Sequence, residues 1–248
     1  MLHQGSTPFL VLDLEAFDAQ LATWNGVQQH DAVEFTLFLM SKMDLSTVHN
    51  IWERRYARES GAVKRHASAA GVNMLHLRVM PDTVQFLHQL IENWHTEAGM
   101  ITAYTHLPSL VCVHLDRLRH MTGSGDGLKL MARVHLDSVI RLPRFTGDGI
   151  QLDFVEYTPI AALAHLGRPN AGHFRAALKC FDFTAATEWL MCDDDSRAMA
   201  TSRLPGWFET QVAMIWLLRT SELCSMQVDF ETTEPVQDPT SILALFQD

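Results

Sequence analysis

Paired cysteines and an excess of basic charge are both missing from this 248-residue sequence, and each absence excludes a class of protein. The four cysteines, Cys112, Cys180, Cys192 and Cys224, form no C-x-x-C pair, so a zinc ribbon has no ligand set. Their spacing is not that of a small secreted disulfide scaffold, which indicates a cytoplasmic or nuclear protein. With 19 Lys and Arg against 29 Asp and Glu, the net charge is -10, which excludes nucleic-acid binding through the phosphate backbone.

Long apolar runs are missing as well. No run is long enough to cross a bilayer, so we expect no membrane partner. The first residues, MLHQGSTPFLVLDLEAF, lack a basic start and soon reach acidic residues, which is not typical of a secretory signal peptide. Hydrophobic residues still make up 47% of the chain and charged residues 19%, the composition of a globular protein that buries a core.

Two helices are predicted in the first part of the chain. Residues 28–43, QQHDAVEFTLFLMSKM, are apolar on most faces, and Asp31 and Glu34 have the spacing of a capping box at the helix start. Residues 83–99 form the second helix, in which Gly99 is a natural stop. Its apolar positions recur at helical spacing: Val84, Leu87, Leu90, Ile91 and Trp94.

Strands are predicted for most of the chain that follows. Residues 109–118 alternate between two faces, and residues 122–127, TGSGDG, form a loop. Further strands are predicted at 128–136, 150–157, 157–167, 173–181, 187–196 and 212–220. Because helices come first and antiparallel-type strands follow, we predict an α+β fold. We expect residues 1–220 to form the domain and residues 221–248, which have no Lys or Arg, to be an acidic, partly disordered tail.

His173 opens one of these strands directly after a glycine-bearing turn. Asp193, at the end of another predicted strand, follows 20 residues later, and a hairpin-like return could bring the carboxylate beside the imidazole. That carboxylate would orient the ring as a general base, and Gly172 would leave room for a substrate backbone. Taken alone, the pattern favours a partly buried, hydrogen-bonded histidine, because the chain has 13 histidines. His165 and His173 lack a tight metal-binding spacing, so we expect no metal and no cofactor.

Five segments, in order, resemble the catalytic domain of ubiquitin-specific proteases, the papain-like deubiquitinases. QQHDAVEFTLFLMSKM resembles their Gln-Gln-Asp-Ala-x-Glu-Phe helix, and LPSLVCVHLDRL resembles a P-x-x-L-x-(I/V)-x-L-x-R-F strand. YTPIAALAHLG with AGHFRAALK resembles the tyrosine-led strand and the Gly-His-Tyr/Phe box. EWLMCDDDS resembles the Trp-x-x-x-Asp-Asp segment, and VAMIWLLR the closing strand. The resemblance implies a papain-like cysteine protease fold, with N-terminal helices as a partial thumb and an antiparallel β palm.

The resemblance also implies roles for particular residues. It makes His173 the general base, Asp193 the acid that orients it, and Asp194 an assisting neighbour. It makes Asp31 a contact for the arginine-bearing tail of ubiquitin, although His30 is an extra residue in that helix. Gln29, Gly172 and Phe174 complete the expected substrate-binding set.

The family nucleophile is the main departure from the pattern. Its Asn-x-Cys-Tyr/Phe box should precede Gln28, where this chain has no cysteine, and Cys192 lies beside Asp193, which disfavours a thiolate. We therefore predict that this chain alone is inactive and acts as a deubiquitinase only when a Cys-bearing segment completes it. A catalytically inactive ubiquitin-binding pseudo-protease or scaffold stays open as the alternative. Ubiquitin and ubiquitinated proteins are the expected partners in both cases.

Overall fold

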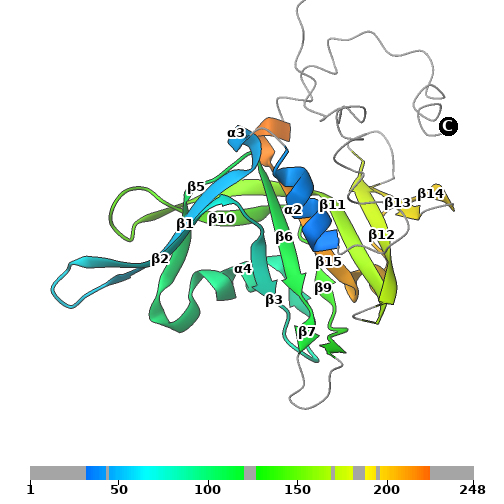
Figure 1. Ribbon diagram of the computed structural model, residues 1–248, viewed down its shortest axis with the longest axis horizontal. Coiled ribbons are helices and arrows are strands. Elements are labelled where there is room, and N and C mark those ends of the chain that lie inside the picture. Colours follow the sequence, from blue (N-terminus) through cyan, green and yellow to red (C-terminus); the bar gives the residue numbers. More distant parts are fainter. Residues whose placement is uncertain are drawn as a thin grey trace, which may run out of the picture.

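The computed structural model describes residues 32–42, 45–119, 127–168, 171–180, 188–193 and 196–223 (Figure 1). Three expected site residues, Gln29, Asp31 and Asp194, lie outside the described residues. The same holds for Cys224 and for almost all of the predicted tail and of the 122–127 loop. The division into a domain and a tail therefore stays a prediction.

One sheet of eleven strands forms the body of the described chain. Its strands are β1 (His49–Ala57), β2 (Val63–Val72), β3 (Leu75–Arg78), β5 (Ile101–His106), β6 (Leu110–Asp116), β10 (Ile140–Phe145), β11 (Leu152–Arg168), β12 (Ala171–Lys179), β13 (Trp189–Asp193), β14 (Ser196–Thr201) and β15 (Val212–Arg219). The main order is β14-β13-β12-β11-β10-β5-β1-β2, and β15 joins β11 to β6 and β3. Two short pairs lie apart: β4 (Gln85–Phe86) with β9 (Val134–His135), and β7 (Leu118–Arg119) with β8 (Leu128–Lys129).

The 17-residue strand β11 connects the two halves of this sheet. Its Tyr157 pairs with Ile140 of β10 on one side and with Arg219 of β15 on the other. Farther along, Ala164 pairs with Arg175 of β12 and with Val212 of β15. Strands β10 and β12 thus follow one another along the same edge of β11.

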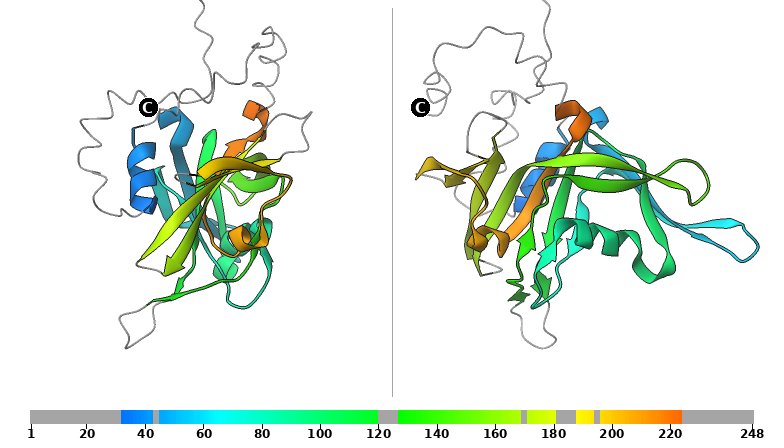
Figure 2. Two further views of the ribbon diagram at one scale, coloured as in Figure 1. Left: turned by 90° about the vertical axis from the view of Figure 1, so that its right-hand side faces the viewer. Right: turned by 180° about the vertical axis from the view of Figure 1, so that it is seen from behind.

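Helices cover both faces of the sheet, as the turned view shows (Figure 2). Helix α2 (Ala32–Met40) packs with Cys112, Leu163 and Met214, whereas α4 (Leu87–His95) belongs to the larger core on the other face. Two single-turn helices, α3 (Leu45–Val48) and α5 (Gly206–Glu209), and a 3-10 turn, η2 (Glu97–Gly99), complete the described helices. None of the described helices is long and apolar enough to cross a membrane.

The predicted α+β class is confirmed, but the predicted order of elements is wrong. Strands β1 to β3 lie between α2 and α4, and β14 lies between β13 and β15. The two strands predicted at 150–157 and 157–167 are the single strand β11, and 128–136 contributes only β8 and β9. The second helix begins at Leu87, after β4, and Val84 is 62% exposed rather than part of its buried face. The other four apolar positions of that helix do pack in the core.

The β1–β2 hairpin escaped prediction because charged residues interrupt its apolar pattern. The hairpin extends from the sheet (Figure 1). Arg55, the last residue of β1 that pairs with β5, anchors it from a position that is 2% exposed. Arg55 donates to the carbonyl oxygens of Gly147 and Gly149 at 2.5 and 2.7 Å and pairs with Glu53 at 2.8 Å. The loop between β10 and β11 thereby fixes the hairpin.

Arg117 is a second buried anchor, directly after β6. It is 4% exposed, and its guanidinium donates to the carbonyl oxygens of Val212, Leu130, Ala132 and Glu209 at 2.6, 3.1, 2.7 and 3.0 Å. Burial lowers the pKa of Arg117 to about 10, so the group stays charged at neutral pH. One side chain therefore joins three segments: 130–132, α5 and the start of β15.

We expect Arg117→Met to lower the free energy of unfolding by at least about 3 kcal/mol, because it leaves several backbone carbonyls without a donor. Arg78→Met is the matched control on an exposed position of β3 and should change the value by less than about 0.5 kcal/mol. Urea unfolding of the two variants measures the difference. Equal stability would show that the carbonyls find other donors.

Candidate functional site

The candidate site lies where β12 leaves its turn. Gly167, with φ 97°, closes β11 in the left-handed region that favours glycine, and β12 then returns antiparallel. In this register Leu166 pairs with His173, and Gly167 pairs with Gly172. The exposed His173 ring thus lies on the same face of β12 as Arg175.

Gly172 is required by the strand pair itself. A Cβ atom there would overlap the carbonyl oxygen of Leu166 and the ring of His165. That ring stacks on Phe174, with 4.7 Å between centroids and 29° between planes. The expected role of Gly172 and Phe174 in substrate binding stays a prediction, and close packing within β11–β12 is a second reason for both residue types.

The His173 and Asp193 side chains meet at hydrogen-bond distance. His173 Nε2 lies 2.5 Å from Asp193 Oδ1, across the antiparallel pair of β12 and β13. This is the approach that the sequence suggests for a strand return over 20 residues. The catalytic roles of both residues, and of Asp194, stay predictions.

Arg175 is a third residue of this candidate site, and the sequence analysis did not single it out. Its Nη2 lies 2.7 Å from Asp193 Oδ2, so the two carboxylate oxygens have different partners. The hydrogen bond from His173, helped by the positive charge of Arg175, holds the pKa of Asp193 below its usual value although desolvation opposes the shift. The alternation of β12 was the available signal, because it places residues 173 and 175 on one face.

Cys112 and Cys192 are not arranged as nucleophiles. Cys112 is fully buried in the α2 cluster, and burial raises the pKa of its thiol to about 12. Burial, with Cys180 nearby, also raises the pKa of Cys192. The Sγ atom of Cys192 lies 3.9 Å from the carbonyl oxygen of Leu190. Of the described residues, no group of three or more His, Cys, Asp or Glu side chains could hold a metal ion.

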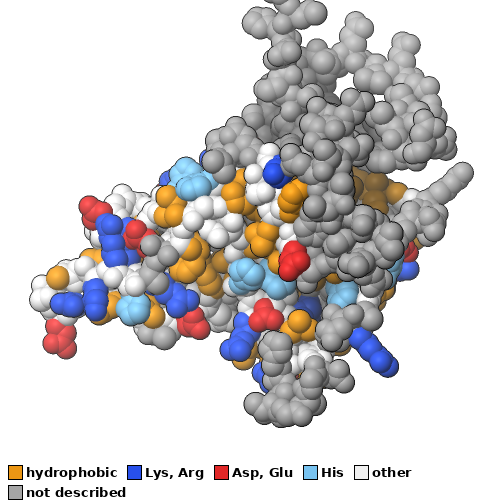
Figure 3. All heavy atoms as spheres, in the orientation of Figure 1, with side chains coloured by type: hydrophobic (Ala, Val, Ile, Leu, Met, Phe, Trp, Pro, Cys, Tyr) orange, Lys and Arg blue, Asp and Glu red, His pale blue; other side chains and the backbone are white. Residues whose placement is uncertain are grey.

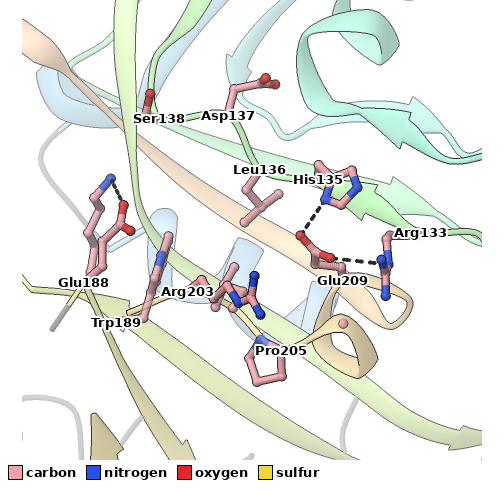
Figure 4. A pocket seen from close by; sticks show the side chains of 13 residues that line it. Arg133, His135, Leu136, Asp137, Ser138, Glu188, Trp189, Arg203, Pro205 and Glu209 are labelled. Atoms are coloured by element: carbon pink, nitrogen blue, oxygen red, sulfur yellow. Dashed lines mark hydrogen bonds and ion pairs between the residues drawn. The ribbon is translucent and has the colours of Figure 1, made fainter. Parts of the chain in front are cut away.

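A separate cavity of about 500 Å³ lies between α5, β9 and the start of β13 (Figure 4). Neither His173 nor Asp193 lines it. Five of the charged or titratable side chains in its lining pair with one another: Glu209 with His135 at 2.7 Å and Arg133 at 3.4 Å, and Lys179 with Glu188 at 3.5 Å. The pairs of Glu209 link α5 to β9 and to Arg133, which precedes that strand.

A mostly antiparallel sheet with a His–Asp pair on neighbouring strands, and with helix α2 packed on it, is consistent with the papain-like cysteine protease fold. The chain belongs to the ubiquitin carboxyl-terminal hydrolase family, whose model matches residues 10–215. The suggested family is therefore confirmed.

Known relatives agree with this assignment. The chain is 34% identical over 90 residues to ubiquitin carboxyl-terminal hydrolase 12 of Salmo salar, a match over 36% of this chain and 23% of the relative. The solved SAGA Ubp8/Sgf11/Sus1/Sgf73 DUB module bound to ubiquitin aldehyde has a similar chain, with TM-score 0.62, 16% identity, and coverage of 82% of this chain and 52% of that one. A further Ubp8-Sgf11-Sgf73-Sus1 module gives TM-score 0.57, 16% identity, and coverage of 85% and 54%. At this identity the structures show the fold, and the chain spans about half of each.

We expect Gly172→Ala to lower the free energy of unfolding by about 1–3 kcal/mol, because the carbonyl of Leu166 cannot yield to a new methyl group. Gly147→Ala is the control, since a Cβ there meets nothing within 4 Å. Thermal or urea unfolding compares the two variants. An unchanged stability of Gly172→Ala would mean that β11 and β12 separate easily at this end.

The ion pairs of Asp193 should make stability depend on pH. Because the folded-state pKa of Asp193 is lowered, its contribution is present above the usual value of 3.8 and is lost as the pH falls through the lowered pKa. The stability difference between the native chain and Asp193→Asn should therefore shrink below about pH 4. Urea unfolding of both proteins from pH 3 to 6 measures this difference. When both also carry His173→Ala, the pH dependence of the difference should be smaller, because Asp193 has lost one of its two partners. A difference that stays constant over this range would contradict the pairing.

Proposed function

We propose that this protein acts in deubiquitination, by thiol-dependent hydrolysis of the isopeptide bond after the C-terminal glycine of ubiquitin. The observation that carries the proposal is the 2.5 Å approach of His173 Nε2 to Asp193 Oδ1. These two residues occupy the positions that resemble the Gly-His-Tyr/Phe box and the Trp-x-x-x-Asp segment of ubiquitin-specific proteases. Family membership supports the reaction class, and the short distance supports His173 as a base with Asp193 as its orienting acid.

We propose different tasks for the two ring nitrogens of His173. Nε2–H would donate to Asp193, which lies 2.5 Å from it, and Nδ1 would receive the proton of a thiol. The thiolate would attack the glycine carbonyl carbon, and the imidazolium would return its proton to the departing lysine amine. Water, activated by the same imidazole, would then hydrolyse the thioester. Asp193 stabilises the imidazolium between these steps.

The thiol itself would come from the family's Asn-x-Cys segment. Residues 1–248 contain no Asn-x-Cys sequence, and neither Cys112 nor Cys192 has an activated thiol. Activity therefore depends on a form of the protein in which such a segment lies against the β12–β13 face.

The proposed partners are ubiquitin and ubiquitinated proteins. A structural neighbour is bound to ubiquitin aldehyde, which supports ubiquitin as the ligand of this fold. Asp31 and Gln29 would contact the arginine-bearing tail, and Gly172 and Phe174 would lie beside its last residues. Asp194 would assist Asp193. The net charge of -10 suits a basic tail, and a cytoplasmic or nuclear site suits the unpaired cysteines.

A non-catalytic ubiquitin-binding module is the second candidate. The raised pKa values of Cys112 and Cys192 favour it, because a protein that keeps the palm without a reactive thiol can bind but cannot cleave. Under this alternative the His173–Asp193 pair is a structural contact of the palm.

We expect His173→Ala to lower kcat by about 10³-fold or more in a form that carries the Asn-x-Cys segment, because general-base catalysis contributes on this scale. Hydrolysis of a ubiquitin C-terminal amide is the measurement. Cys192→Ser is the matched control and should leave kcat unchanged. Retained activity in His173→Ala would remove the histidine from its role as base.

Treatment of the 248-residue chain with a ubiquitin that bears a C-terminal electrophile distinguishes the two candidate functions. The proposal predicts no covalent adduct with this chain and rapid labelling of the thiol-bearing form. Binding of ubiquitin without labelling of either form would establish the pseudo-protease instead.

A further inference from the structure

We propose that Arg175 is a positioning residue for the His173–Asp193 pair and that Trp207 holds it there. This inference rests on the proposed function, since it gives that site a third side chain. Arg175 Nη2 donates to Asp193 Oδ2 at 2.7 Å, while His173 Nε2 meets Oδ1 at 2.5 Å. Arg175 would therefore act on the histidine through the Asp193 carboxylate.

A carboxylate held through one oxygen can turn about its terminal torsion, which has a broad minimum. Such a turn would move Oδ1 away from the His173 ring and let the imidazole change its orientation. With Arg175 on Oδ2, both oxygens of Asp193 are fixed and the plane of the carboxylate is set. The arginine thus limits the directions in which Nδ1 of the histidine can point.

Trp207 keeps the guanidinium of Arg175 in place. The Arg175 guanidinium carbon lies 5.4 Å from the centroid of the Trp207 ring, a cation–π distance. Arg175 Nε is buried without a hydrogen-bond partner, so the charge–ring contact and the bond to Asp193 are what orient the group. Trp207 itself belongs to α5, whose next residue, Phe208, is fully buried.

Helix α5 is in turn fixed from three sides. The backbone carbonyl of Glu209 accepts from Arg117, and its carboxylate pairs with His135 and Arg133. A short element can therefore carry Trp207 rigidly, and Figure 4 shows Glu209 directed at these two partners. Contacts thus run without interruption from the buried Arg117 to the exposed His173.

The charge of Arg175 also favours ionised Asp193. Among the described residues, the titratable groups that act on Asp193 are His173 and Arg175, both from β12. Removing the arginine should therefore raise the pKa of Asp193 toward its usual value. This readout reports on the carboxylate directly and requires no catalysis.

The test compares Arg175→Met with the native chain by ¹³C NMR titration of the Asp193 carboxyl group. We expect its pKa to rise toward 3.8 in the variant, with a smaller rise in Trp207→Leu. Arg144→Met is the matched control: it removes the partner of Asp153, whose pKa should rise while that of Asp193 stays unchanged. Unchanged Asp193 titration in both Arg175→Met and Trp207→Leu would overturn the proposal.

Kinetics in the thiol-bearing form give the second readout. A positioning role predicts that Arg175→Met lowers kcat about 10-fold with KM unchanged, and that Arg175→Lys restores part of the loss. A rise in KM with kcat unchanged would make Arg175 a substrate contact and reject the positioning role. If no form is active, the proposed function fails, whereas a raised Asp193 pKa in Arg175→Met would still support the contact as the device that sets this carboxylate.

Discussion

The register between β11 and β12 is the constraint on which the rest of the site depends. A slip of one residue would turn every side chain of β12 to the other face, and His173 would no longer meet Asp193. Two features hold the register. Strand β11 is already fixed by β10 and β15, and Gly172 permits an approach to Leu166 that any side chain would block. The contact between His173 and Asp193 therefore depends on the same strand packing that holds β11 against β12.

Buried arginines explain how a sheet with such long, curved strands stays in one shape. Arg55 and Arg117 each donate to backbone carbonyls of segments that are far apart in sequence. On the surface view, hydrophobic side chains lie over the middle of the described face together with histidine and acidic side chains, and basic side chains are plain to see toward its left and lower ends (Figure 3).

The sequence predicted the α+β class, most of α4, and the meeting of His173 with Asp193, because each depends on local spacing and alternation. It did not predict the β1–β2 hairpin, whose charged residues hide the apolar period. It also missed Arg175, because its partner is known only once β13 pairs with β12. Val84 was wrongly assigned to the buried face of the helix. Its spacing fits the helical period, but the residue lies before the helix begins and is exposed. Long-range pairing, not local propensity, decides these cases.

The central claim is that Asp193 sets His173 as a base whose Nδ1 receives the proton. The most direct test is the tautomer of His173, read from its two ring ¹⁵N shifts by NMR in the 248-residue chain at a pH where the ring is neutral. Our account predicts a proton on Nε2, hydrogen-bonded to Asp193, and its loss from that fixed position in Asp193→Ala. A neutral ring with its proton on Nδ1 would contradict the account.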